Sequence, residues 1–383
     1  MDQFNRGGTA IVGAATFGMG EAPGYTSRDL AAAASVAALA QAGLEPHHVD
    51  GLFVCLSDDM LSGMTMAEYL GIRPRLTDSN RTGGSSPLIH VMHAALALDQ
   101  HQCDVALIAY GSNQRTATGK LASVLRTSIY EAPYRAMSPV SAYALAAARH
   151  MYQYGTTREQ LGAVALAARQ WARLNPDAFL REELTMQEYL AARLVSDPLG
   201  VRDCCLVTDG AAAIVMTRAD RAKDHAPRPA YVLGAASATW HQEISNAPDL
   251  TVTAAVESGS RAYAQARVRA ADIDVLEVYD AFTVNTLLFL EDLGFCPKGE
   301  GGRFVEQGRI APGGKLAVNT NGGGLSCVHP GIYGLFTLVE ATQQLAGLAG
   351  ARQVVDAELA LCHGNGGVLS SQATVILGTG ATL

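Results

Sequence analysis

The segment 318–339 (VNTNGGGLSCVHPGIYGLFTLV) places a histidine between a glycine-rich turn and an apolar run of helical character. The asparagines and glycines of 319–324 can adopt backbone angles that are closed to most residues. Pro330 suits the first turn of a helix, so the pattern predicts His329 at a helix N-terminus. The helix dipole there disfavours a protonated imidazole, which predicts a neutral histidine that donates a hydrogen bond. A histidine that only caps the loop is the alternative.

Two more side chains that can transfer protons follow apolar runs typical of buried strands. Tyr279 comes directly after the run DVLEV, and Cys362 ends the run ELALC and opens a predicted glycine-rich loop, CHGNGG. Functional sites of open α/β sheets lie on loops at the carboxyl ends of strands. We therefore expect Tyr279, Cys362 and His329 to converge, together with the polar loop 78–87 (DSNRTGGSSP).

The second half of the chain repeats the strand–helix order of the first half. The stretch 266–278 (ARVRAADIDVLEV) parallels 42–54 (AGLEPHHVDGLFV), and Asp274 then corresponds to Asp50. An internal duplication of an α/β unit explains this pattern. It predicts two βαβαβαββ-type halves that form a layered α/β/α/β/α core.

The boundaries of these halves follow from changes in the pattern along the chain. Residues 1–113 and 204–225 form the predicted N-terminal half, and residues 226–383 form the C-terminal half. Residues 114–203 depart from this strand–helix order and contain two clear helices and several tyrosines. They are predicted to be a helical insertion that lies over the core and covers a ligand site.

The composition excludes several classes of protein. Apolar residues make up 49% of the 383 residues and charged residues 17%, which is typical of a folded, soluble chain. The net charge of −8 gives no general attraction to nucleic acid or to anionic membranes. No apolar run reaches the ~18–20 residues needed for a membrane span. The seven cysteines are scattered without a C-x-x-C pair, so we expect a cytoplasmic protein with reduced thiols and no metal site.

Taken together, these loops resemble those of the thiolase superfamily, and most closely its SCP2-thiolase-like branch (lipid-transfer-protein thiolases). The resemblance covers nearly the whole chain. It rests on the segment 154–178 in the insertion, on TDGAAA, on the His-Pro step, on Cys362-x-Gly364 and on the YDAF that begins at Tyr279. It implies an enzyme of lipid metabolism that uses a CoA thioester as substrate and holds no permanently bound cofactor.

The resemblance also implies roles for individual residues. His329 would donate a hydrogen bond to the thioester oxygen, and Tyr279 stands where the family holds a water in the same oxyanion hole. Cys362 would move a proton at the α-carbon, with Gly364 and Asn321 supporting the loops. Tyr333 and His363, the residue after Cys362, are predicted to be packing residues.

One departure from the family decides the type of reaction. Thiolases carry a nucleophilic cysteine three residues after the asparagine of the first loop, and counting from Asn80 reaches Gly83. Ser85 and Ser86 are the nearest hydroxyls, but neither falls on the aligned position and no base for them is apparent. The remaining residues favour making or breaking a carbon–carbon bond through an acyl-CoA enolate, most simply by aldol or retro-aldol chemistry.

Two other functions stay open at this point. The chain could be a thiolase or acetyl-CoA acyltransferase with an unusual nucleophile, or a non-catalytic scaffold subunit that binds acyl-CoA. His329 and Cys362 argue against the scaffold, because a scaffold needs neither. The resemblance further implies a homodimer built through core strands of the first half, and a DUF35 zinc-ribbon/OB-fold partner protein.

Overall fold

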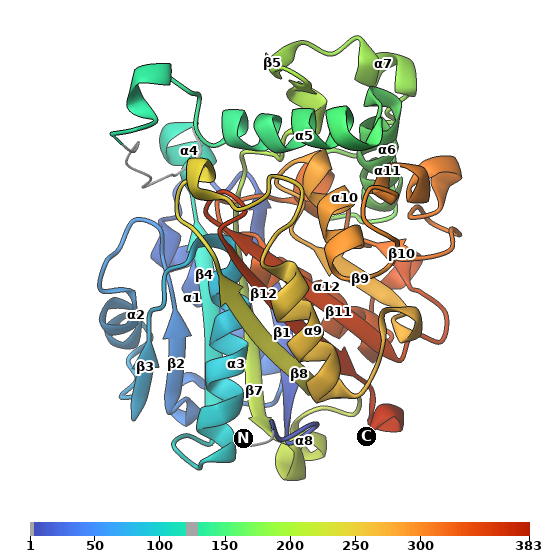
Figure 1. The fold of residues 1–383 in the computed structure, drawn as a ribbon. Coiled ribbons are helices and arrows are strands. Elements are labelled where there is room, and N and C mark those ends of the chain that lie inside the picture. The colour runs from blue at the N-terminus through green and yellow to red at the C-terminus, as the bar shows by residue number, and fades with distance from the viewer. Residues whose placement is uncertain (1–3, 120–128) are drawn as a thin grey trace.

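The core of the protein is a ten-stranded mixed sheet, seen in a computed structural model that describes residues 4–119 and 129–383 (Figure 1). The strand order in these residues is β10-β9-β11-β12-β8-β1-β7-β4-β2-β3. The first half supplies β1 (Thr9–Gly20), β2 (Gly51–Val54), β3 (Leu76–Asp78), β4 (Val105–Ser112) and β7 (Asp209–Arg218). The second half supplies β8 (Ala230–Thr239), β9 (Val275–Val278), β10 (Ala317–Val318), β11 (Leu359–Gly366) and β12 (Ser371–Gly378).

The strand order is symmetric about the centre of the sheet. Read outward from the centre, the first half runs β1-β7-β4-β2-β3 and the second half β8-β12-β11-β9-β10. The two halves join through a short antiparallel contact in which Ala10 pairs with Tyr231 and Ile11 with Ala230. The predicted duplication and the α/β fold class are confirmed.

The two halves of this sheet form the two β layers of the predicted five-layer arrangement, and helices form the other three. Helix α1 (Ser27–Gln41) packs on strands of the first half, and α9 (Ala255–Ala266) packs on strands of the second half. Helices α3 (Ser86–Asp99) and α12 (Gly334–Ala346) each contact strands of both halves. The resulting order is α/β/α/β/α, with α3 and α12 in the middle layer.

Glycines at equivalent places let the outer helices approach the sheet closely. A Cβ on Gly13 of β1 would lie 2.1 Å from the carbonyl oxygen of Ala38 in α1. A Cβ on Gly234 of β8 would lie 2.4 Å from the carbonyl oxygen of Ala262 in α9. Both distances are shorter than any real contact, so each helix depends on a glycine beneath it.

The paired aspartates of the repeat also perform the same task in both halves. The Asp50 carboxylate accepts from the backbone amides of Asp104 and Val105, where β4 begins. The Asp274 carboxylate accepts from the amide of Leu359, where β11 begins. Each aspartate therefore fixes the start of the neighbouring parallel strand.

The remaining helices of the two halves are α2 (Ser62–Leu70), α8 (Ala219–His225), α10 (Thr283–Asp292) and α11 (Gly301–Phe304). The insertion contains α4 (Gln114–Thr118), α5 (Val140–Tyr154), α6 (Arg158–Arg173), α7 (Met186–Leu190), β5 (Leu194–Ser196) and β6 (Leu199–Gly200). It lies over one end of the core, at the top of Figure 1. Residues 120–128 of the predicted insertion lie outside the described residues. In the described part of the chain, no helix has the length and apolarity to cross a membrane.

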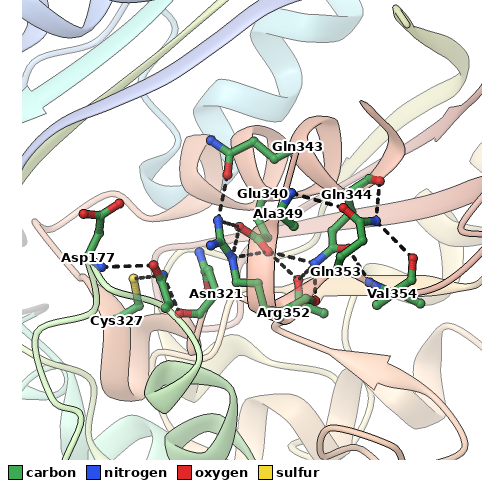
Figure 2. Close-up of polar contacts among 12 residues, drawn as sticks. Asp177, Asn321, Cys327, Glu340, Gln343, Gln344, Ala349, Arg352, Gln353 and Val354 are labelled. Carbon is green, nitrogen blue, oxygen red and sulfur yellow. Dashed lines mark hydrogen bonds and ion pairs between the residues drawn. The ribbon is translucent and has the colours of Figure 1, made fainter. Parts of the chain in front are cut away.

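Buried polar contacts tie these layers together. His150 of α5 is hydrogen-bonded through Nε2 to Glu291 of α10 at 2.9 Å, which attaches the insertion to the second half. Figure 2 shows a second network, in which Arg352 donates to Glu340 and Gln343 of α12. Thr320 donates to the Glu340 carboxylate as well, at 2.7 Å, so α12 is fixed to the loop that leads to His329.

We predict that Gly234→Val lowers the stability of the protein by about 1–3 kcal/mol or more, because the new side chain must push α9 off the sheet. The shift would appear as a lower midpoint of urea unfolding. Gly380→Ala is the control, since its Cβ would meet only the Tyr231 ring at 3.7 Å. Equal midpoints for the two variants would contradict the close approach of α9.

Candidate active site

A cavity of about 380 Å³ lies beneath the insertion, where loops of both halves meet. Its size falls in the range of small-molecule sites. It brings together two of the three predicted catalytic residues, His329 and Tyr279, with Gly83 of the predicted polar loop. The rest of its lining consists of Ser57, Arg81, Thr82, Gly84, Pro139, Tyr143, Cys205, Ala281, Phe282, Gly331, Ile332, Asn365 and Gly367.

The His329 loop is held in place by residues of the first half and the insertion. The His329 amide donates to Thr208 Oγ1 at 2.9 Å, and its carbonyl accepts from Gln114 Nε2 at 2.7 Å. The next carbonyl, of Pro330, accepts from the Tyr110 hydroxyl at 2.6 Å. These bonds fix the backbone on both sides of the imidazole, so its position depends on the packing of the two halves.

The predicted helix N-terminus at His329 is wrong. Helix α12 begins at Gly334, and His329 follows a single π-helical turn, Gly323–Cys327, after an extended Val328. The Pro330 carbonyl is taken by Tyr110 rather than by a helix. Burial, and not a helix dipole, therefore controls the charge of the imidazole.

His329 and Tyr279 form a hydrogen-bonded pair inside the cavity. His329 Nε2 lies 2.9 Å from the Tyr279 hydroxyl oxygen, and that hydroxyl also lies 3.1 Å from the carbonyl oxygen of Gly331, to which it can donate. When the phenol donates to Gly331, the imidazole N–H must donate to the phenol. His329 Nδ1 is buried and has no partner among the described residues.

Both members of the pair are neutral at rest. Burial lowers the pKa of His329 from 6.5 to about 4, which leaves the imidazole uncharged at neutral pH. Burial also raises the pKa of Tyr279 well above 10, and the nearby Cys205 adds to this shift. The site thus holds a neutral histidine, as predicted, beside a phenol that keeps its proton.

Gly83, the position predicted for the thiolase nucleophile, has a backbone conformation and close neighbours that disfavour any side chain. Gly83 has a φ of +83°, a conformation that L-residues rarely adopt. A Cβ there would lie 3.0 Å from both Gly366 Cα and Gly367 N. A Cβ on Gly84 would lie 2.0 Å from the ring of Tyr279, so this second glycine makes room for the phenol.

Cys362 does not join the other two predicted catalytic residues. The predicted loop at 362–367 is wrong up to Gly366, because β11 extends from Leu359 to Gly366 and pairs with β12 along its whole length. The Cys362 thiol points at the carbonyl oxygen of Thr337 in α12, at 3.5 Å. It is buried outside the cavity lining, and burial raises its pKa well above 9.

The two predicted loop supports lie just outside the cavity. Asn321 accepts hydrogen bonds from the Tyr333 hydroxyl at 2.9 Å and from the Gly323 amide at 2.7 Å, so it shapes the turn before His329. A Cβ on Gly364 would lie 3.0 Å from the carbonyl oxygen of Gly84. Gly364 therefore allows the first loop to pack against β11.

The other residues considered from the sequence lie away from the cavity lining. Ser85 is buried and bonds to the Ser371 hydroxyl at 3.0 Å, and Ser86 accepts from the amide of Thr82 at 2.7 Å. His363 is held between Thr374 and Gln372. The hydroxyls of both serines are engaged within the fold, which gives a serine nucleophile no support.

Sequence reasoning missed two polar residues of the site. Tyr143 of α5 reaches down from the insertion, donates to the carbonyl of Gly367 at 3.0 Å and accepts from Asn365 at 2.8 Å. Its pKa is raised to about 12 by burial. Asn365 belongs to the CHGNGG motif, and an asparagine within a glycine-rich segment was a signal that could have identified it. Tyr143 is one of many tyrosines in the insertion, and nothing in the pattern singles it out.

Asp280 shapes the site from behind the cavity. Its carboxylate accepts from the amide of Gly324 at 2.6 Å and from that of Leu325 at 3.3 Å, within the π-helical turn before His329. Burial raises its pKa from 3.8 to about 7, although these hydrogen bonds oppose the shift. The turn is thus held by a group that titrates near neutral pH.

With this geometry in view, comparisons with known proteins define the class. Residues 236–379 match the family described as "Thiolase C-terminal domain-like". The chain is 33% identical over 383 residues to an acetyl-CoA acetyltransferase of Methanothermobacter thermautotrophicus, covering 96% of this chain and 98% of that protein. It is also 33% identical over 364 residues to the 17-hydroxy-3-oxo-4-pregnene-20-carboxyl-CoA lyase of Mycobacterium tuberculosis, covering 89% and 92%.

Solved structures of similar fold indicate the same superfamily as these relatives. The chain superposes on an "Ltp2-ChsH2(DUF35) aldolase" with a TM-score of 0.87 and 31% identity, over 98% of both chains. The human mitochondrial 3-ketoacyl-CoA thiolase shares the fold, with a TM-score of 0.72 at 16% identity over 98% of this chain and 100% of that one.

The fold and the buried His–Tyr site therefore define a thiolase-like enzyme acting on CoA thioesters. The chain belongs to the thiolase superfamily, in its SCP2-thiolase-like branch.

We predict that Asp280→Asn changes how stability depends on pH. The folded-state pKa of about 7 lies above the unfolded value of 3.8, so the stability that this carboxyl contributes is present at low pH and is lost as pH rises towards 7. Between about pH 5 and 7, the wild type should lose up to ~1.4 kcal/mol per pH unit relative to Asp280→Asn. Urea unfolding at several pH values measures the slope, and parallel profiles for the two proteins would rule the shift out.

Proposed function

We propose that the enzyme cleaves 3-hydroxyacyl-CoA thioesters by a retro-aldol reaction, releasing an aldehyde or ketone and a shortened acyl-CoA. One observation carries the proposal: the predicted position of the thiolase nucleophile is Gly83, where a positive φ and tight contacts disfavour a side chain, while His329 and Tyr279 remain paired. The site keeps the groups that stabilise an enolate but lacks the group that accepts an acyl chain. Relatives named as a lyase and as a steroid side-chain-cleaving aldolase support the same chemistry.

The reaction needs no net proton. The β-hydroxyl loses its proton, its O–H electrons form the new carbonyl, and the Cα–Cβ bond breaks. The electrons of that bond pass to the thioester as an enolate, and Cα then takes up a proton. A neutral pair that receives one proton and delivers another is sufficient, and neither His329 nor Tyr279 carries a charge at rest.

The two residues divide the work in this proposal. When substrate is bound, the Nε2–H of His329 donates to the enolate oxygen in place of the Tyr279 hydroxyl, a contribution of about 3–4 kcal/mol for a preorganised donor in a buried site. The Tyr279 hydroxyl relays the proton between the β-oxygen and Cα. This relay does without Cys362, whose thiol lies against Thr337.

The relatives also guide a proposal for the assembly. The structure titled "Ltp2-ChsH2(DUF35) aldolase" supports a DUF35 partner for this chain. A cytoplasmic homodimer that holds no permanently bound cofactor is the rest of the proposed assembly. Activity assays should therefore be run both on the chain alone and with a candidate DUF35 protein, and gel filtration with light scattering will give the assembly state.

Product analysis tests the reaction type directly. Incubation with a 3-hydroxyacyl-CoA should yield equal amounts of carbonyl product and shortened acyl-CoA by liquid chromatography and mass spectrometry. Intact-mass analysis should find no acylated protein, because Gly83 offers no nucleophile. A stable acyl-enzyme would overturn the proposal in favour of a thiolase with an unusual nucleophile. Tight binding of acyl-CoA without turnover, even with the partner, would favour a scaffold.

Substitutions test the assignment of roles. We expect Tyr279→Phe and His329→Ala each to lower kcat at least ~100-fold, the scale for losing an oxyanion donor or a general acid–base group. Cys362→Ala and Ser85→Ala should stay within about threefold of the wild type. Loss of activity in Cys362→Ala, with an unchanged fold by circular dichroism, would instead restore the sequence-based role of this thiol and refute the two-residue relay.

A further inference from the structure

A chain of buried hydrogen bonds leads from the sheet of the second half to Tyr143 in the candidate active site. His363 Nε2 lies 2.9 Å from Gln372 Oε1, and Gln372 Nε2 donates to Asn365 Oδ1 at 2.8 Å. Asn365 Nδ2 donates to the Tyr143 hydroxyl oxygen, also at 2.8 Å. Asn365 and Tyr143 line the cavity. Gln372 and His363 are fully buried and lie outside its lining, so the chain joins a site residue of the insertion to a histidine behind the site.

A single proton fixes the direction of this chain. The Tyr143 hydroxyl donates its one proton to the carbonyl oxygen of Gly367 at 3.0 Å, and a carbonyl can only accept. Asn365 must therefore present its amide N–H to the phenol oxygen, which turns the Asn365 oxygen towards Gln372. By the same rule, Gln372 presents its NH₂ group to Asn365 and its oxygen to His363. The proton of the imidazole then lies on Nε2, and every hydrogen bond of the chain points towards the cavity.

The imidazole of His363 is suited to the far end of the chain. Its Nδ1 lies 3.0 Å from the Thr374 hydroxyl and accepts from it when Nε2 donates to Gln372. Phe289 of α10 packs edge-on against the ring, with centroids 4.5 Å apart. Burial lowers the pKa of His363 from 6.5 to about 4, so at neutral pH the ring has one donor and one acceptor. This is the state that a chain of one direction requires.

The chain makes Tyr143 a strong donor in a fixed place. A hydrogen bond accepted at the phenol oxygen polarises the O–H group, because neighbouring hydrogen bonds in a buried chain strengthen one another. The Tyr143 ring packs against Phe282, with centroids 4.4 Å apart, in the loop that also carries Tyr279. After burial itself, Cys205 and Tyr143 are the neighbours that raise the pKa of Tyr279 most. Both phenols line one cavity and can act on the same substrate.

A β-hydroxyl in this cavity needs a donor for its oxygen. In the proposed reaction, His329 meets the thioester oxygen and Tyr279 receives the proton of the β-hydroxyl. A buried oxygen left without a donor is costly. The O–H of Tyr143 can turn from Gly367 to this oxygen by rotation about its C–O bond, while Asn365 continues to donate to the phenol oxygen. A β-hydroxyl that accepts from Tyr143 then directs its own proton elsewhere, towards Tyr279.

We infer that Tyr143 is a further catalytic residue, which donates a hydrogen bond to the β-oxygen of the substrate. His363 is its positioning residue and acts through Gln372 and Asn365. The inference deepens the proposed function and rests on it for the β-oxygen that Tyr143 meets. Tyr143 keeps its own proton throughout, orients the β-hydroxyl and stabilises the charge that develops on its oxygen. His363 does not touch the substrate.

Two CoA thioethers test the contact by binding alone, because neither has the thioester that retro-aldol cleavage needs. S-(3-hydroxybutyl)-CoA carries the β-hydroxyl, and S-butyl-CoA lacks it. Isothermal titration calorimetry of the full chain should show the hydroxylated probe binding about tenfold tighter, the scale of one net hydrogen bond. Tyr143→Phe should reduce this ratio to about twofold or less by weakening the hydroxylated probe. Tyr152→Phe is the matched control, since it removes a phenol hydroxyl from a position of α5 that is 85% exposed, and it should retain the ratio.

Variants of His363 test the positioning role at a distance from the cavity. His363→Leu removes the donor to Gln372, so the chain can reverse its direction, and the ratio should fall to about threefold or less. His363→Gln keeps an N–H group at the place of Nε2 and should restore the tenfold ratio. A loss of packing alone would weaken both probes alike and would not be repaired by glutamine.

The outcomes separate this inference from the proposed function. A wild-type ratio near one, or a ratio that survives Tyr143→Phe, would overturn the inference. An unchanged ratio in His363→Leu, with an intact fold by circular dichroism, would refute the positioning role. In the cleavage assay, Tyr143→Phe should lower kcat at least about tenfold, and Tyr152→Phe should not. If the ratio depends on Tyr143 but the wild type releases no carbonyl product from a 3-hydroxyacyl-CoA, the proposed reaction fails and the contact to the β-oxygen stands.

Discussion

The site depends on one hydrogen bond, between the imidazole of His329 and the hydroxyl of Tyr279, made in a place that keeps both groups neutral. Neither loop could hold this geometry alone. The His329 backbone is fixed by Thr208 and Gln114, and the Pro330 carbonyl by Tyr110, all outside the second half that carries the pair. The geometry of this pair is therefore a consequence of packing two duplicated halves against each other.

The glycines of the first loop show how a thiolase fold can hold different chemistry. A side chain on Gly84 would collide with Tyr279, and one on Gly83 would be strained by the positive φ and by the close approach of Gly366 and Gly367. The first loop thus makes room for the Tyr279 phenol beside a position that carries no nucleophile. In the proposed mechanism the enolate donor, His329, comes from a different loop.

The insertion contributes directly to the candidate active site. Helix α5 carries Tyr143, which bonds to Asn365 and Gly367 in the lining of the cavity. The buried His150–Glu291 contact anchors this helix to α10. A substitution that moves α5 would consequently change the candidate active site as well.

The duplicated α/β architecture can be predicted from the sequence, as can the correspondence of Asp50 with Asp274 and the loops that carry His329, Tyr279 and Gly83. Those features are encoded in short local runs of residues and in the order of short motifs, so they can be recognised without knowing the tertiary packing. The position of Cys362 against α12 follows from the structure and not from the sequence pattern, because the register of β11 with β12 sets the face on which each side chain lies. The structure also places Tyr143 in the site. It shows that burial, rather than the expected helix dipole, lowers the pKa of His329, and burial depends on neighbours distant in the chain.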